Sequence, residues 1–138
     1  YGVRQISRSA FGAIAFFHLG LTPDYVASAD NATTNGSWAF VVARYDSNAS
    51  KTAVIVNNTK VEQSVTGSLT ESNGAFTIGA QLETPRYSDG IIDEVRIAAL
   101  ARSDEWIATE YANHNSPSTF ATASEGSEIL SETHGLRI

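Results

Sequence analysis

The residue of this sequence best suited to chemistry is Asp93, in the segment Gly90–Ile97. Ile91, Val95 and Ile97 share one face of that segment, with the period-2 alternation of a β-strand packed on one side. Asp93 falls in phase with this apolar face. Because an unpartnered buried charge is costly, its carboxylate must lie at the rim of a sheet, pair with a cation, or bind a ligand.

Two interpretations of Asp93 stay open. In the first it ligates a structural Ca²⁺, because hard cations take carboxylate and carbonyl oxygens and loops near strand ends supply them. Asp46 and Asn48 could then add oxygens from a loop. In the second interpretation Asp93 caps a turn or pairs with an arginine such as Arg96 or Arg102.

The titratable residues form no recognisable catalytic set. Asp93 and Glu94 are adjacent, so in a strand they point to opposite faces, whereas a retaining glycosidase needs two carboxyl groups about 5 Å apart. His18, His114 and His134 share no metal-ligand spacing, and no G-x-S-x-G or glycine-rich phosphate loop occurs. His18 lies near a strand end, where we expect it to be accessible. We predict that the chain is not an enzyme.

Aromatic side chains are the other candidates for ligand contact. Arg86 and Tyr87 lie in the loop before the Asp93 segment, and we predict that this loop binds a ligand. Asp89 follows them and is interpreted as an ordinary turn residue. Trp38 and Trp106 lie in apolar patterns, so we expect them in the core rather than at a sugar-binding surface.

Asn-x-Ser/Thr sequons are more frequent than the composition would give by chance. Each has a residue other than proline in the middle, as N-glycosylation requires. Asparagine, serine and threonine are also ordinary turn residues, so the excess has a second explanation. Used sequons would place the protein outside the cell or on its surface. The four predicted acceptors are Asn31, Asn35, Asn48 and Asn57.

Most of the chain is typical of β-strands. Alternating or continuous apolar runs between turn residues predict strands over 2–9, 11–19, 23–29, 38–46, 52–56, 60–66, 75–80 and 90–97. The run 38–46 is apolar on both faces, so we expect it to be a central strand covered on both sides.

One helix is predicted, and it follows the last of these strands. Ser103 is a good N-cap, and acidic residues come directly after it. We expect Trp106, Ile107 and Tyr111 to share the apolar face of this helix. The segment Asn113–Pro117 ends it.

Bulk composition limits the classes of partner. The chain of 138 residues predicts one domain, and its 42% hydrophobic residues are enough for a core. The net charge of −6 disfavours nucleic acid, and no run approaches the 18 apolar residues of a membrane span. Cysteine is absent, so there are no disulfides. We expect one domain over residues 1–120 and a tail or linker over 121–138.

The segment FTIGA…YSDGIIDEVRIAALARSDEWIATEYAN resembles the closing part of laminin G-like, concanavalin A-like jelly-roll domains. Similar modules occur on large secreted or surface proteins of archaea and bacteria. The resemblance implies an all-β fold, an antiparallel jelly-roll β-sandwich with one short C-terminal helix. The chain offers fewer strands than the complete type, so the missing strands would precede Tyr1. The strand that contains Asp93 is expected to close the sandwich, and this assignment depends on it.

The resemblance implies a non-catalytic module that binds carbohydrate or protein, with a glycan or a surface protein as partner, in an extracellular or cell-surface location. The alternative is a structural subunit or decoration of an extracellular filament, surface layer or virion fibre, in which a neighbouring chain completes the sheet. A glycoside hydrolase fragment is the third hypothesis. It is disfavoured because the E-x-D-x-x-E pattern of laminarinase-type members is absent from these residues.

Overall fold

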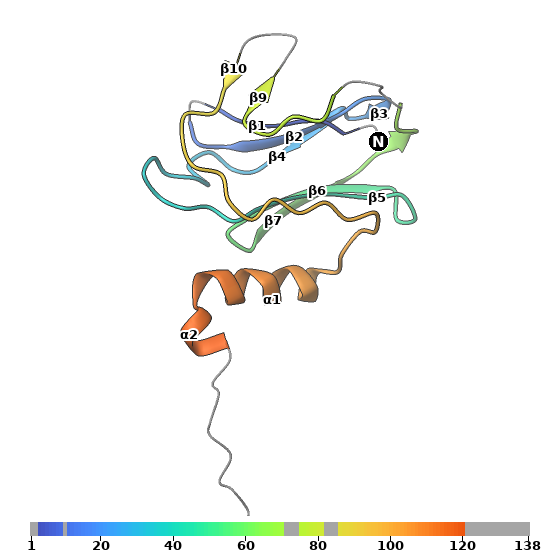
Figure 1. Ribbon diagram of the computed structural model, residues 1–138. Helices are drawn as coiled ribbons and strands as arrows, with labels where there is room; N and C mark the ends of the chain where they lie inside the picture. Colours follow the sequence, from blue (N-terminus) through green and yellow to red (C-terminus); the bar gives the residue numbers. More distant parts are fainter. Residues whose placement is uncertain (1–2, 10, 71–74, 82–85, 121–138) are drawn as a thin grey trace, which may run out of the picture.

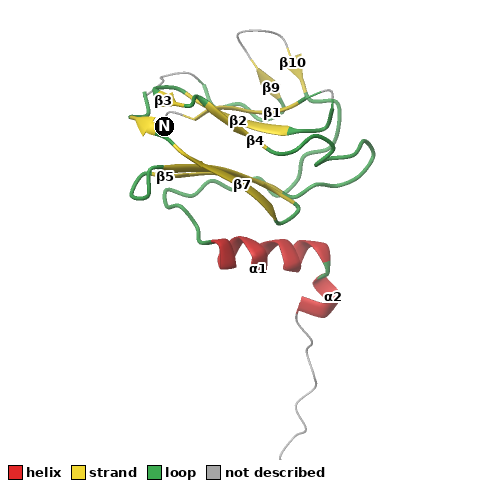
Figure 2. Cartoon of the chain, turned by 180° about the vertical axis from the view of Figure 1, so that it is seen from behind, coloured by secondary structure: helices red, strands yellow, loops and turns green. Residues whose placement is uncertain are grey.

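The computed structural model describes residues 3–9, 11–70, 75–81 and 86–120. Two three-stranded antiparallel sheets stack face to face, and one helix covers the outside of the second (Figures 1 and 2). The elements in chain order are β1 (Val3–Arg8), β2 (Ile14–His18), β3 (Leu21–Thr22), β4 (Tyr25–Ala27), β5 (Val41–Asp46), β6 (Lys51–Val56), β7 (Thr59–Ser64), β8 (Thr66–Gly67), β9 (Ala80–Gln81), β10 (Arg86–Tyr87), α1 (Asp104–Asn115) and α2 (Pro117–Phe120).

Neighbouring strands in both large sheets are joined by local connections. The first sheet has the order β1-β2-β4 and the second has the order β5-β6-β7. Two short antiparallel pairs, β3 with β8 and β9 with β10, lie beside them. The strands predicted over 2–9, 11–19, 23–29, 52–56 and 60–66 are therefore confirmed, with ends that differ by one to three residues and with the last divided between β7 and β8.

The core lies between the two sheets. Ile14 and Phe16 of β2 and Val26 of β4 pack against Val54 and Val56 of β6. These residues are spaced two apart along their strands, so one face of each strand is apolar and buried, as a sandwich requires.

Strand β6 is buried on both faces. Its even-numbered residues point to the first sheet, whereas Ala53 and Ile55 point outward and pack against Ile107 of α1.

The segment 38–46 was predicted to be a central strand covered on both sides. The cover is confirmed for β5, because Ala43 packs against the core between the sheets and Val42 packs against the cluster that contains Ile107, but the central position is wrong. Strand β5 lies at the edge of its sheet and begins only at Val41, so Trp38 precedes the strand.

Helix α1 confirms the predicted cap. The Ser103 side chain accepts a hydrogen bond from the Trp106 N–H, and the helix ends at Asn115. Ile107 and Tyr111 share the face toward the sheet, where the Tyr111 ring lies 5.9 Å from that of Phe40. Trp106 does not share that face, because one residue along a helix turns the side chain by about 100°. None of the helices in the described parts of the chain has the length and hydrophobicity of a membrane span.

The expected closing strand over 90–97 is wrong. Residues 89–103 form no strand, and the Ile91 and Ile97 side chains are 80% and 75% exposed. Glu94 has φ +54, which interrupts an extended path, and no described strand lies in register beside this segment. Period-2 alternation alone does not make a strand, because a strand needs a neighbour to accept its backbone hydrogen bonds. The sandwich does not depend on this segment, since it is built from β1-β2-β4 and β5-β6-β7.

Two further predictions concern the ends of the described regions. Of the strand predicted over 75–80, only Ala80 belongs to a strand, β9. The predicted tail, 121–138, lies outside the described residues, so its role as linker or arm stays a prediction.

Replacing Ile107 by alanine should lower the free energy of unfolding by about 2–5 kcal/mol, because the side chain is 2% exposed and fills the contact between α1 and β6. Urea denaturation followed by circular dichroism measures this change. Ile97→Ala is the matched control, since it removes the same atoms from an exposed position and should change the free energy by about 0.5 kcal/mol or less. Equal losses in the two variants would contradict the packing of α1 against β6.

Candidate functional site

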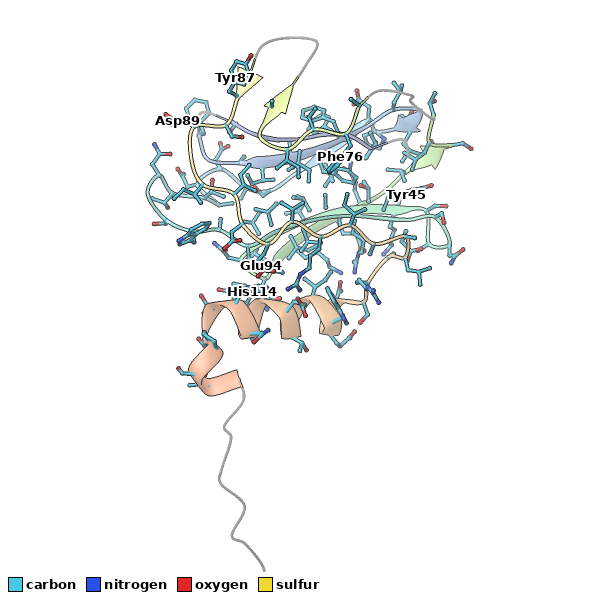
Figure 3. All side chains as sticks on the ribbon, in the orientation of Figure 1. Tyr45, Phe76, Tyr87, Asp89, Glu94 and His114 are labelled. Atoms are coloured by element: carbon cyan, nitrogen blue, oxygen red, sulfur yellow. The ribbon has the colours of Figure 1, made fainter. Side chains whose placement is uncertain are left out.

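Tyr87 and Asp89 lie on an outer corner of the molecule, at the end of β10 (Figure 3). Strand β10 pairs antiparallel with β9, with Tyr87 opposite Ala80, and the Ser88 N–H donates to the Gly79 carbonyl at 2.8 Å. This short ladder fixes the backbone on both sides of Tyr87. The Tyr87 side chain is 78% exposed, and Asp89 is also exposed.

This corner has the chemistry of a polar ring-binding surface. A tyrosine ring offers an apolar face and a hydroxyl, and a carboxylate accepts hydrogen bonds from hydroxyl groups. Arg86, predicted to bind with Tyr87, precedes it in β10, but its side chain lies outside what the structure describes. The structure thus presents Tyr87 and Asp89 together at one corner, and Asp89 was interpreted from the sequence as a turn residue alone.

The surroundings of Asp93 do not match the donor set that calcium prefers. Its Oδ1 accepts a hydrogen bond from the Glu94 N–H at 2.8 Å, so one carboxylate oxygen is already bonded to the backbone of the next residue. Within the described part of the chain, no group of three or more histidine and acidic residues could hold a metal ion. Arg96 pairs with Glu94 and Glu110, and Arg102 lies over the Trp106 ring. Calcium at Asp93 stays an untested prediction.

Both tryptophans lie at the surface, so the prediction that they pack in the core is wrong. Trp38 is 69% exposed in the loop before β5, and Trp106 is 41% exposed on the solvent side of α1. The Arg102 guanidinium lies 5.0 Å from the centre of the Trp106 ring, a cation–π geometry. An apolar neighbourhood in sequence did not indicate burial, because Trp38 precedes the strand and Trp106 lies off the buried face of α1.

His18 is buried, although the sequence suggested that it would be accessible. It ends β2 in phase with Ile14 and Phe16, and its ring lies edge-on to Phe16 at 5.5 Å. Neither ring nitrogen has a hydrogen-bond partner among the described residues. Burial lowers the pKa of His18 and so favours the neutral ring, and the nearby Asp24 carboxylate opposes this only in part.

A network of five charged side chains joins the second sheet to α1, and sequence reasoning missed it. Glu62 of β7 accepts from Arg44 of β5 at 3.1 Å and from Lys51 of β6 at 2.7 Å. Asp104, in the first turn of α1, pairs with Arg44 at 2.8 Å and with Lys60 of β7 at 2.5 Å. The network borders an open hollow of about 440 Å³.

The electrostatics of this network are those of a structural clamp. The Lys51 ammonium, through its hydrogen bond, holds the pKa of Glu62 below its usual range, and Lys60 does the same for Asp104. Arg44 also donates to the Arg102 carbonyl at 2.7 Å, just before the helix begins. The network alone has three cations and two carboxylates, but the lining of the hollow also includes Arg102, Asp46 and Glu105, so its charged side chains balance and offer a ligand no net charge. We assign the network to helix docking.

Comparison with known families matches this architecture. The laminin G family model described as the concanavalin A-like lectin/glucanases superfamily matches residues 4–108. The chain belongs to this family. The match begins in β1 and extends into α1, so it covers both sheets of the laminin G-like domain and the segment between β10 and the helix. The predicted family and the all-β sandwich are therefore confirmed.

One solved structure is similar to part of the domain. A crystal structure of an S-layer domain-containing protein, residues 221–444, from Clostridium thermocellum ATCC 27405 aligns with a TM-score of 0.47 and 18% sequence identity. The alignment covers 80% of this chain and 58% of that chain. No curated protein matches the laminin G-like domain significantly.

Replacing Glu62 by glutamine should lower the free energy of unfolding by about 1 kcal/mol at pH 7, because three cations lose their shared carboxylate. The folded-state pKa of Glu62 is below its unfolded value, so the carboxylate contributes above the unfolded pKa and its contribution is lost as the pH falls through the folded pKa. The difference between wild type and variant should therefore be full at pH 7 and shrink as the pH falls below the unfolded pKa of about 4.3. Urea denaturation across pH 3–8 measures it.

Asp30→Asn is the control for Glu62→Gln, since it removes a carboxylate from an exposed loop. It should leave the free energy of unfolding nearly unchanged across the same pH range. A Glu62→Gln effect that is equally large at pH 3 and pH 7 would contradict the charge network.

Proposed function

We propose that this laminin G-like domain is a non-catalytic binding module of a secreted or cell-surface protein, and that it takes carbohydrate at the corner formed by Tyr87 and Asp89. The observation that carries the proposal is the Tyr87 ring, 78% exposed on backbone that the β9–β10 ladder holds in place. A ring held in this way can stack on the apolar face of a sugar. Asp89, two residues later, can accept hydrogen bonds from sugar hydroxyl groups.

The roles of the nearby carboxylates support binding over hydrolysis. Glycoside hydrolysis needs two carboxyl groups on either side of the scissile bond. In the segment after β10, Asp93 is hydrogen-bonded to the Glu94 N–H, and Glu94 pairs with Arg96 at 2.9 Å. Both carboxylates therefore have structural partners. The proposal assigns no chemical step to them.

Tyr87→Ala should weaken carbohydrate binding about tenfold, because it removes the stacking surface, whereas Tyr87→Phe should keep most of the affinity. A glycan array with and without calcium first identifies a ligand, and isothermal titration calorimetry then compares the variants. A silent array, or equal affinities for Tyr87→Ala and wild type, would contradict the proposal. A response that requires calcium would renew the case for a metal ligand at Asp93.

A second candidate function is a structural role in an extracellular assembly. The observation that favours it is the apolar segment between β10 and α1, in which Ile91, Ile97 and Leu100 are each at least 74% exposed. Large apolar side chains that are exposed to solvent can form interaction surfaces in soluble proteins where they are contiguous. In this role the segment would gain a neighbouring chain as its partner.

If the domain self-associates, Ile97→Glu should shift it toward the monomer by placing a charge in the contact. Size-exclusion chromatography with light scattering measures the mass over a range of concentrations. Ser37→Glu adds the same charge to an exposed loop and is the matched control. A wild-type domain that is monomeric at every concentration would rule out self-assembly through this segment.

A further inference from the structure

The four sequons differ in how the folded domain presents them to a glycosyltransferase. N-glycosylation of a folded protein needs the asparagine amide and the hydroxyl two residues later to be presented together to a transferase. All four asparagines are exposed, so their exposure does not separate them. The sequons differ in what holds the asparagine side chain and in whether the hydroxyl is accessible.

The whole sequon that begins at Asn48 is exposed. It lies in the loop between β5 and β6, where residues 47–50 are all exposed. The Asp46 carboxylate shapes this loop by accepting from the backbone N–H groups of Asn48 and Ala49, at 3.0 and 3.1 Å. The fold thus uses a neighbouring side chain to hold the loop. The asparagine of this sequon and its third residue, Ser50, are therefore both exposed.

Asn35 is presented in a similar way. It lies in the long loop between β4 and β5, and Asn35, Gly36 and Ser37 are all exposed. A Cβ added to Gly36 would meet no atom within 4 Å, so the middle of this sequon stands in open space. The loop has room for a bulky, hydrated group.

The Asn31 sequon lacks an accessible hydroxyl. Thr33 is buried, and its Oγ1 donates to the Gly12 carbonyl at 2.8 Å while its N–H donates to the same carbonyl at 2.9 Å. These bonds join the loop after β4 to the turn before β2. A transferase could reach this hydroxyl only if the loop were opened.

The Asn57 sequon belongs to a closed hairpin. Asn57 and Asn58 form the two-residue turn between β6 and β7, both with positive φ, and the pair Val56–Thr59 closes it. The Asn57 Oδ1 accepts from the Phe40 N–H at 2.9 Å, and the Asn57 N–H donates to the Phe40 carbonyl at 2.9 Å. The asparagine side chain is therefore held against the backbone before β5, and its third residue is already in a strand.

We propose that in the folded domain Asn35 and Asn48 are acceptors for an N-linked glycan and that Asn31 and Asn57 are not. The donor is an oligosaccharide carried on a polyprenyl diphosphate. The bond from sugar C1 to the diphosphate oxygen breaks, a bond from C1 to the asparagine Nδ2 forms, the amide loses one proton, and the lipid diphosphate leaves. This assignment is independent of the carbohydrate-binding corner.

The test is glycosylation of the folded protein in vitro. Purified domain is incubated with an oligosaccharyltransferase and the lipid-linked donor, and glycopeptide mass spectrometry gives the occupancy of each site. Synthetic peptides that each carry one sequon give the intrinsic acceptor activity of that sequon. The occupancy of each site in the folded domain, divided by this activity, is its normalised occupancy. We expect the normalised occupancy of Asn35 and Asn48 to exceed that of Asn31 and Asn57 at least tenfold.

Two variants sharpen the outcome. Ser50→Ala should abolish modification at Asn48 and leave Asn35 unchanged, and Ser37→Ala should do the reverse. The proposal is overturned if normalised occupancy at Asn31 or Asn57 reaches that of the other two sites. It is also overturned if neither Asn35 nor Asn48 is modified in the folded domain while their peptides are.

Discussion

Burial of β6 on both faces is the constraint on which the rest of this domain depends. Every side chain from Thr52 to Val56 is buried, so the strand needs a cover on each side. The first sheet supplies one through Ile14, Phe16 and Val26, and α1 supplies the other through Ile107. Losing either layer lowers the stability of this strand, because apolar burial and packing contacts are lost together. The charge network around Glu62 and Asp104 then fixes where the helix lies on that surface.

Because the two large sheets and α1 form the core, the segments outside them are free to bind ligands. The proposed carbohydrate corner at Tyr87 and the proposed glycan sites at Asn35 and Asn48 all lie outside the two sheets that form the core. Substitutions there change surface chemistry with little effect on packing. A rigid scaffold that carries variable loops is the usual arrangement in binding modules.

Local patterns predicted the elements that local chemistry determines. The two hairpins formed by β5, β6 and β7 were predicted from alternation and turn residues. The start of α1 was predicted from Ser103 and the acidic residues after it. Prediction was wrong wherever the answer depended on a partner far away in sequence. The segment 90–97 alternates like a strand but has no neighbour in register, and Trp38 lies beside an apolar run but outside the strand. At the candidate corner, the sequence singled out Tyr87 as a loop residue, whereas the structure places it in β10, and the part proposed for Asp89 required the structure.

The connection between β10 and α1 has a consequence for partial unfolding. Residues 89–103 contribute no ladder hydrogen bonds, and their ties to the helix include the ion pair of Arg96 with Glu110. Detaching α1 therefore breaks one layer of contacts and leaves both sheets paired. Helix α1 and the segment 89–103 form a unit that can open without global unfolding. Release of the helix would expose the apolar side chains of Ala53 and Ile55. Under mechanical load on the C-terminal side, this layer would yield before the sandwich does.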